Sequence, residues 1–317
     1  MKRLLSQPLP TLAAAGALWA AAGALPAAAQ APDAAEPVPK RINRVIELLE
    51  RGQPVYYTTA YGGYNEGVAL AGTEYDYINY EMEHGAFDMT ALRDFMRGLV
   101  DGGPTPSGHR TPAVIVTLPV LGLDEASMRA NYWVVHQALA AGVHGILLCH
   151  TRVPGAARAF VEAARYPFAP PVEGLEQGLR GSGSQSYAAR IWGVAPNEYL
   201  QKADPWPLNP AGELLLGVKI EDSHALENAD LTTAVPGIAF TEWGPGDMGF
   251  WLAGLPRPGA QALPEMRAAR ERVFQAARDN GIYMLHACNE DNVVDLLDEG
   301  VMICSGGWRA GHAHTQR

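Results

Sequence analysis

Eight short apolar segments that alternate with helix-like stretches constrain this sequence more than any other feature. Each segment is rich in β-branched or aromatic residues, as buried strands are. They span residues 54–62, 75–83, 113–120, 144–151, 214–220, 237–243, 282–288 and 301–307. Because alternating strands and helices build parallel sheets, eight such units in a chain of 317 residues predict a closed (β/α)8 barrel, the TIM-barrel fold.

Helical periodicity fills most of the gaps between these segments. The expected helices span residues 41–52, 88–100, 125–142, 156–166, 186–203, 263–281 and 289–300. In a barrel of this kind the functional residues lie at the carboxyl ends of the strands. Polar side chains at those ends are therefore the candidates for a site.

The amino terminus has the layout of a secretory signal peptide. Lys2 and Arg3 precede a long Ala/Leu run, and small residues surround Ala29. The alternative is an uncleaved membrane anchor, since the run approaches the ~20 residues that cross a bilayer. We predict a signal peptide at residues 1–29, a linker at 30–40 and one barrel domain at 41–317. A secreted or periplasmic location, without membrane contact after cleavage, follows from that division.

Charge and cysteine content narrow the classes of partner. The formal net charge is −10 at pH 7, and no run of Lys or Arg follows the amino terminus. Nucleic acids and anionic membranes are thus excluded as expected partners. Three cysteines are too few for a disulfide scaffold and leave at least one free thiol. A bridge between Cys288 and Cys304 stays open.

Acids and imidazoles are concentrated at the predicted strand ends. They include Glu81, Glu83, His84, His150, Glu221, Asp222, Glu242, Asp247 and His286. Charges at the tips of buried strands need partners, and a divalent cation is one such partner. Glu221 and Asp247 follow adjacent strands, so both carboxylates can reach one point above the barrel. Two carboxylates leave room for water and substrate, as catalytic Mg²⁺ and Mn²⁺ sites do.

The segment WGPGDMG, residues 243–249, adds a second feature to this region. Its small residues let the backbone N–H groups around Gly246 and Asp247 face a substrate carboxylate, especially where a helical turn begins. The alternative interpretation is a plain turn with an Asx cap, and a salt-bridged strand end at Glu221.

The order of these motifs resembles the HpcH/HpaI family of metal-dependent (class II) pyruvate aldolases. The resemblance runs from about Val55 to Gly307. It is carried by DYINYEMEHGAFDMTALRDFMRGL, GVHGILLCHTRVPGAARAFVEAARYP, GLRGSGS and VKIEDSHALENADLTTAVPGIAFTEWGPGDMG.

The resemblance implies a lyase that reversibly cleaves a 4-hydroxy-2-oxo acid to pyruvate, or a related 2-oxo acid, and an aldehyde. Glu221 and Asp247 would hold the cofactor, a divalent cation such as Mg²⁺, Mn²⁺ or Co²⁺. His84, paired with Glu81, would be catalytic and move protons. The amides around Gly244, Gly246 and Asp247 would bind the 2-oxo acid carboxylate. A homo-oligomer is possible.

Three departures from the family pattern qualify that expectation. Thr117 stands where the family has an oxyanion-stabilising arginine. His150 and Arg152 follow the fourth strand and either contact the substrate instead or serve the loop. Only ten residues follow the SGG of the last strand, so we expect a truncated eighth helix and a solvated tail.

Two other functions remain open at this point. One is a β-keto acid decarboxylase or tautomerase that uses the same metal scaffold, which the loss of the third-strand arginine favours. The other is a non-catalytic periplasmic protein that binds a keto acid.

Overall fold

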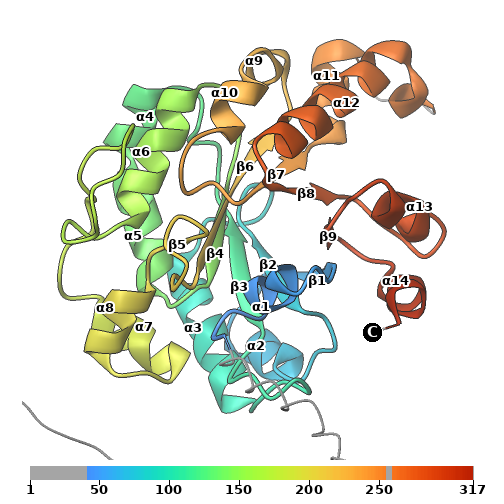
Figure 1. Ribbon diagram of the computed structural model, residues 1–317. Helices are drawn as coiled ribbons and strands as arrows, with labels where there is room; N and C mark the ends of the chain where they lie inside the picture. The colour runs from blue at the N-terminus through green and yellow to red at the C-terminus, as the bar shows by residue number, and fades with distance from the viewer. Residues whose placement is uncertain (1–40, 255–258, 317) are drawn as a thin grey trace, which may run out of the picture. The chain divides into compact units, whose positions relative to one another are not determined.

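The computed structural model describes residues 41–254 and 259–316 (Figure 1). The predicted signal peptide and linker, residues 1–29 and 30–40, lie outside the described residues. Among the residues that are described, no helix has the length and apolar character needed to cross a bilayer.

A ring of eight parallel strands forms the centre of the described part of the chain. The ring is made of β1 (Val55–Ala60), β2 (Tyr77–Glu81), β3 (Ala113–Thr117), β4 (Gly145–Leu148), β6 (Leu214–Ile220), β7 (Phe240–Trp243), β8 (Tyr283–His286) and β9 (Ile303–Cys304). Pairing of β4 with β6 and of β9 with β1 closes it, and the two-residue β5 (Pro205–Trp206) adds to β6. The predicted (β/α)8 barrel and all eight predicted strands are confirmed.

Helices surround this ring, as Figure 1 shows. They are α1 (Arg44–Glu50), α2 (Tyr64–Leu70), α3 (Met89–Asp101), α4 (Glu125–Ala130), α5 (Tyr132–Ala140), α6 (Pro154–Ala164), α7 (Gln185–Trp192), α8 (Pro196–Lys202), α9 (Ser223–Glu227), α10 (Ala229–Thr233), α11 (Pro245–Leu252), α12 (Pro264–Asp279), α13 (Val293–Asp298) and α14 (Trp308–Thr315).

Two predicted helices are each divided in the structure. The stretch 125–142 is α4 and α5, because Asn131 leaves helical geometry and caps the last carbonyls of α4. The stretch 186–203 is α7 and α8. Gly193, at φ 72°, ends α7, and Pro196 begins α8. Both breaks follow from residues that favour helix ends.

Apolar side chains fill the amino-terminal half of the barrel. Tyr57, Tyr77, Leu215 and Phe240 belong to one buried cluster with α1, which packs beneath the ring. The rings of Tyr57 and Tyr77 lie 4.8 Å apart. A solid floor of this kind leaves space only toward the carboxyl ends of the strands.

The end of the chain is a helix and not the solvated tail that we predicted. In α14, His312 packs its ring 5.1 Å from that of Tyr56, and His314 Nε2 lies 2.9 Å from Asp298 Oδ1. Gly311 permits this contact, since a Cβ there would fall 2.0 Å from Tyr56 Oη.

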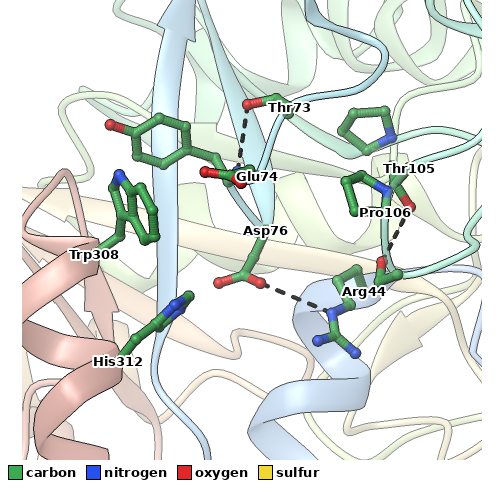
Figure 2. A pocket seen from close by; sticks show the side chains of 11 residues that line it. Arg44, Thr73, Glu74, Asp76, Thr105, Pro106, Trp308 and His312 are labelled. Atoms are coloured by element: carbon green, nitrogen blue, oxygen red, sulfur yellow. Dashed lines mark hydrogen bonds and ion pairs between the residues drawn. The ribbon is translucent and has the colours of Figure 1, made fainter.

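A cavity of about 210 Å³ separates α14 from the amino-terminal end of the barrel (Figure 2). Trp308 and His312 line one side, and Asp76 and Arg44, 3.8 Å apart, line the other. Asp76 precedes β2 and so belongs to the stabilising end of the barrel rather than the functional end.

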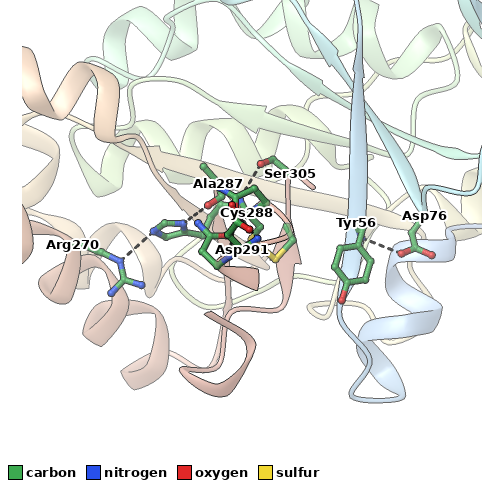
Figure 3. The surroundings of a disulfide bond; sticks show 11 residues. Tyr56, Asp76, Arg270, Ala287, Cys288, Asp291 and Ser305 are labelled. Atoms are coloured by element: carbon green, nitrogen blue, oxygen red, sulfur yellow. Dashed lines mark hydrogen bonds between the residues drawn. A yellow bond between two sulfur atoms is a disulfide. The ribbon is translucent and has the colours of Figure 1, made fainter. Parts of the chain in front are cut away.

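A disulfide joins Cys288 to Cys304, and Cys149 is a buried free thiol. Figure 3 shows the bridge between the segment after β8 and the last strand, where Ser305 Oγ accepts the N–H of Cys288 at 3.1 Å. The pairing that the sequence left open is therefore present.

Candidate metal centre

Four side chains from separate elements converge at the carboxyl ends of the strands. Glu83 follows β2, His150 follows β4, Glu221 follows β6, and Asp247 lies in the first turn of α11. Each offers one ligand atom, and all four atoms lie within 4.8 Å of one another. The predicted pair Glu221 and Asp247 thus comes together, with two further side chains beside it.

Buried polar atoms in this cluster lack partners. Glu83 Oε1 and Glu221 Oε1 have no hydrogen-bond partner among the described residues. The side chains of Glu83 and Glu221 are only 3% and 1% exposed. Leaving such atoms unpaired costs about 1–3 kcal/mol each or more. Opposite ligands of a cation with ~2.1 Å bonds lie about 4.2 Å apart, so a divalent ion fits this spacing.

Lys219 holds the two buried carboxylates from the other side. It lies on β6 two residues before Glu221, and its Nζ donates to Glu83 Oε2 at 2.5 Å and lies 3.5 Å from Glu221 Oε2. Each carboxylate therefore turns Oε2 to the ammonium and Oε1 to the cluster. Lys219 orients both ligands without occupying the unpaired atoms.

The balance of charge in the cluster also suits a divalent ion. When all three are ionised, Glu83, Glu221 and Asp247 together outnumber the one ammonium of Lys219 by two charges. Burial raises the pKa of Glu221 to about 9, against the pull of Lys219 and with the help of nearby carboxylates. Although burial opposes it, those carboxylates hold the pKa of Lys219 well above its usual value. Lys219 is thus a fixed cation and not a neutral amine nucleophile.

The Gly-Pro-Gly segment forms the floor beside these acids. A Cβ on Gly244 would lie 2.3 Å from Glu221 Oε2, so this position must be glycine for the carboxylate to keep its place. Pro245 begins α11, and no side chain caps the first turn of that helix. The N–H groups near Gly246 and Asp247 lie at this helix amino terminus, where an anion binds favourably.

His150 and Arg152 form a network behind the cluster. His150 Nδ1 lies 3.1 Å from Asp222 Oδ2, and Arg152 Nε donates to the same oxygen at 2.8 Å. Despite burial, His150, the N–H of Ala225 and Arg152 hold the pKa of Asp222 well below its usual range. The guanidinium of Arg152 also lies 5.3 Å from the centre of the Trp251 ring. Arg152 therefore binds Asp222, which directly follows the cluster residue Glu221 in the chain.

The predicted pair His84 and Glu81 lies at the rim. The imidazole of His84 is 66% exposed, with Nε2 3.6 Å from Glu83 Oε2. Glu81 Oε1 accepts the backbone N–H groups of Glu83 and His84, at 2.6 and 3.0 Å. The carboxylate of Glu81 therefore fixes the loop that carries His84. Proton transfer by this pair stays a prediction.

A polar cavity of about 160 Å³ opens beside the cluster inside the barrel. Its lining includes Glu81, Thr117, Lys219 and Glu242, and Thr117 Oγ1 donates to Asn79 Oδ1 at 2.7 Å. Burial raises the pKa of Glu242 to about 7, with Lys219 opposing the rise. Lys219 is thus a cation that lines the same cavity as Thr117.

Two other basic side chains face away from the cluster. His286 Nε2 accepts from Arg270 Nε at 3.1 Å and so points toward α12. Arg180 donates to Tyr199 Oη at 2.9 Å and to Ala203 O at 3.2 Å.

Our reading of the sequence missed Lys219 and did not assign Glu83 a role. Alternation along β6 places Lys219 on the same inward face as Glu221. A lysine inside the otherwise apolar run LLLGVKI was the available signal.

A closed parallel barrel with acids, an imidazole and an ammonium at the carboxyl ends of its strands is the arrangement of a (β/α)8 enzyme. The chain belongs to the HpcH/HpaI aldolase/citrate lyase family, whose profile matches residues 68–315. The resemblance noted in the sequence is confirmed.

Named relatives agree with this assignment. A hydroxypyruvate/pyruvate aldolase of Deinococcus radiodurans is 29% identical over 216 residues, which cover 67% of this chain and 65% of the relative. One of Cupriavidus necator is 30% identical over 198 residues, covering 61% and 66%. The chain thus spans less than two thirds of these relatives. A family structure from Burkholderia cenocepacia has a TM-score of 0.65 at 21% identity, covers 86% of this chain and 95% of its own, and shows the fold alone.

Proposed function

We propose that the protein is a divalent-metal-dependent aldolase that cleaves a 4-hydroxy-2-oxo acid to pyruvate, or a related 2-oxo acid, and an aldehyde. The observation that carries the proposal is the convergence of Glu83, His150, Glu221 and Asp247, with buried ligand atoms left unpaired. Family membership and relatives named as aldolases support the reaction class.

The residues of the chain divide the work of binding. Glu221 and Asp247 hold the cation, and Lys219 keeps the carboxylate of Glu221 in place. The open amino terminus of α11, near Gly246, receives the carboxylate of the 2-oxo acid. A cation held by Glu221 and Asp247 would supply Lewis-acid stabilisation of the charge that develops on the 2-oxo oxygen.

Cleavage requires one proton to leave and one to arrive. A base takes the proton of the 4-hydroxyl group, the bond between C3 and C4 breaks, and the aldehyde departs. The bond's electron pair passes toward the 2-oxo oxygen until C3 is protonated. His84 is the proposed proton carrier, because it lies at the rim beside Glu83 and its loop is fixed by Glu81.

The test measures pyruvate release from a panel of 4-hydroxy-2-oxo acids with Mn²⁺, Mg²⁺, Co²⁺ or EDTA. We expect metal-dependent release that Asp247→Asn abolishes. Asp230→Asn, which alters a surface ion pair with Arg272, is the matched control and should retain the activity. Absence of pyruvate from every substrate and metal would refute the aldolase function.

A second candidate reaction is decarboxylation or tautomerisation of a β-keto acid on the same scaffold. Thr117 favours it, because β3 contributes no cation beside an incoming aldehyde. Turnover of oxaloacetate without turnover of any 4-hydroxy-2-oxo acid would select this reaction. Binding of a keto acid without any turnover would instead select a binding protein.

We also propose that the protein is exported. The predicted signal peptide at residues 1–29 suggests it, and the Cys288–Cys304 disulfide supports it, because such bonds persist in oxidising compartments. Periplasmic fractionation followed by amino-terminal sequencing tests the proposal. Export predicts a mature chain that begins at Gln30, whereas an intact Met1 in the cytoplasmic fraction would overturn it.

A further inference from the structure

The imidazole of His150 occupies a place that the two-carboxylate centre does not explain. It lies among the ligand atoms of Glu83, Glu221 and Asp247, whereas the proposed proton carrier His84 lies outside that group. Its ring has Nδ1 3.6 Å from Glu221 Oε1 and Nε2 4.0 Å from Glu83 Oε1. A ring nitrogen can therefore reach the same cation as the carboxylates.

The backbone of His150 is fixed by its neighbours. Cys149 O accepts the N–H groups of Leu121 and Gly122, at 2.8 and 3.0 Å, and Thr151 N donates to Lys219 O at 3.0 Å. A Cβ on Gly122 would fall 2.6 Å from His150 O, so the two loops pack backbone to backbone. The ring is thus presented from a rigid segment between β3 and β6.

Asp222 sets the direction of the ring. Its Oδ2 lies 3.1 Å from His150 Nδ1, within hydrogen-bonding distance. Asp222 is itself held by Arg152 Nε at 2.8 Å and by Ala225 N at 2.8 Å. A carboxylate on one nitrogen of an imidazole directs the lone pair of the other nitrogen, which is the usual arrangement behind a metal-bound histidine.

We propose that His150 is a nitrogen ligand of the divalent cation and that Asp222, held by Arg152, is its positioning residue. The inference rests on the metal dependence proposed above. The site then offers three carboxylates and one imidazole in place of two carboxylates alone.

This ligand set favours a particular class of metal. Carboxylates suit Mg²⁺ and Mn²⁺ alike, whereas an imidazole adds affinity for first-row transition ions. His150 should therefore raise the affinity for Co²⁺ and Mn²⁺ much more than that for Mg²⁺.

The direct test is electron spin-echo envelope modulation of Mn²⁺ bound to the whole protein. We expect modulation from a directly bound ¹⁴N nucleus in the wild type, its loss in His150→Gln, and its retention in His84→Gln. Circular dichroism and thermal unfolding confirm that each variant is folded. His84 is the matched control because it lies near Glu83 but outside the ligand group.

Calorimetric titration with Co²⁺ and Mg²⁺ gives a second readout. His150→Gln should weaken Co²⁺ binding at least ~10-fold and change Mg²⁺ binding by a smaller factor. Asp222→Asn should weaken Co²⁺ binding by ~10-fold as well, since a carboxylate beside a metal-bound histidine commonly contributes that much. Asn remains a good helix cap, so α9 is preserved in this variant.

The outcomes separate this inference from the proposed function. Mn²⁺ that binds and supports pyruvate release but shows no ¹⁴N modulation, or modulation that survives in His150→Gln, overturns the nitrogen ligand and leaves the aldolase intact. Equal loss of Co²⁺ and Mg²⁺ affinity also overturns it. Failure of the wild type to bind any divalent cation overturns both.

Discussion

Buried glutamates lie at both ends of β6, and they differ in their hydrogen-bond partners. Glu213, just before the strand, and Glu221, just after it, are each 1% exposed. Glu213 Oε2 accepts the N–H of Asn43 at 2.9 Å, and its Oε1 lies 3.6 Å from Arg41. Glu221 Oε1 has no partner among the described residues. One strand thus ends in a satisfied structural acid below and an unsatisfied acid above.

The difference shows that burial does not distinguish a structural acid from a ligand. What distinguishes them is the count of partners. At the amino-terminal end, His109 Nε2 also lies 3.0 Å from Glu47 Oε2, and His144 Nδ1 accepts from Val114 N at 3.1 Å. The acids and histidines at the amino-terminal end are thus paired with other protein groups, whereas Glu221 at the carboxyl end keeps an oxygen available for a ligand.

The largest expected effect comes from neutralising Glu221, the acid at the carboxyl end of β6. Glu221→Gln should lower metal-dependent pyruvate release by at least ~10²-fold, because a metal ligand is lost. Thermal stability should be unchanged or higher, since a buried acid without a full set of partners is removed. Steady-state kinetics and thermal unfolding check the two parts, and wild-type turnover in this variant would contradict the assignment.

A methyl group beside the same acid should have the next largest effect. Gly244→Ala places a Cβ 2.3 Å from Glu221 Oε2 and should displace that carboxylate. We expect Mn²⁺ affinity to fall by ~10- to 100-fold, as when ligand geometry is disturbed. At Gly246 a Cβ meets no atom within 4 Å, so Gly246→Ala is the matched control for Mn²⁺ binding. Equal affinities in the two variants would count against the clash.

Neutralising Glu213, at the amino-terminal end of β6, should lower the stability of the protein and leave its activity unchanged. Glu213→Gln should cost about 1–3 kcal/mol of unfolding free energy, because Arg41 loses one of its two carboxylate partners and the N–H of Asn43 keeps a weaker acceptor. Pyruvate release should stay at the wild-type rate. Chemical denaturation and steady-state kinetics measure both. A variant of unchanged stability but reduced activity would reverse our division of the strand.

The smallest expected effect concerns how the free energy of unfolding depends on pH through His144, at the amino-terminal end of the barrel. Burial lowers the pKa of His144 to about 3, and nearby His109 adds to the shift. Below about pH 6.5 the imidazole of His144 takes up a proton in the unfolded chain but stays neutral in the folded protein. The free energy of unfolding therefore falls as the pH drops from about 6.5 toward 3. His144→Gln should reduce this slope by up to ~1.4 kcal/mol per pH unit.

Denaturant titrations from pH 7 to pH 4 measure that slope. His224→Gln, at an exposed histidine, serves as the control and should keep the wild-type slope. A slope that is the same in His144→Gln and in the wild type would show that other groups govern acid unfolding.

The sequence contains enough information for the barrel but not for every helix. Eight strand patterns predict the ring because each is a short apolar run with a helix after it. The break at Asn131 follows from a local cap that the periodicity did not show, whereas the final helix α14 depends on contacts made in three dimensions. In that helix Gly311 packs against Tyr56, and the ring of Trp308 packs against Tyr75.

The site was predictable to the same partial degree. Glu221 and Asp247 could be paired because they end neighbouring strands. The position of His150 among the ligand atoms could not, because it depends on how Asp222 and Arg152 turn the ring. Lys219 was hidden in an apolar run, although alternation along the strand predicts that it faces inward.

The Cys288–Cys304 disulfide ties the last strand of the barrel to the segment that follows β8. Strands β8 and β9 pair through only two residues of β9, Ile303 and Cys304. The bond closes a loop of 16 residues, which is worth about 3 kcal/mol in a chain-entropy description. The bond therefore reinforces the short pairing of β8 with β9, and a reducing compartment would remove that reinforcement.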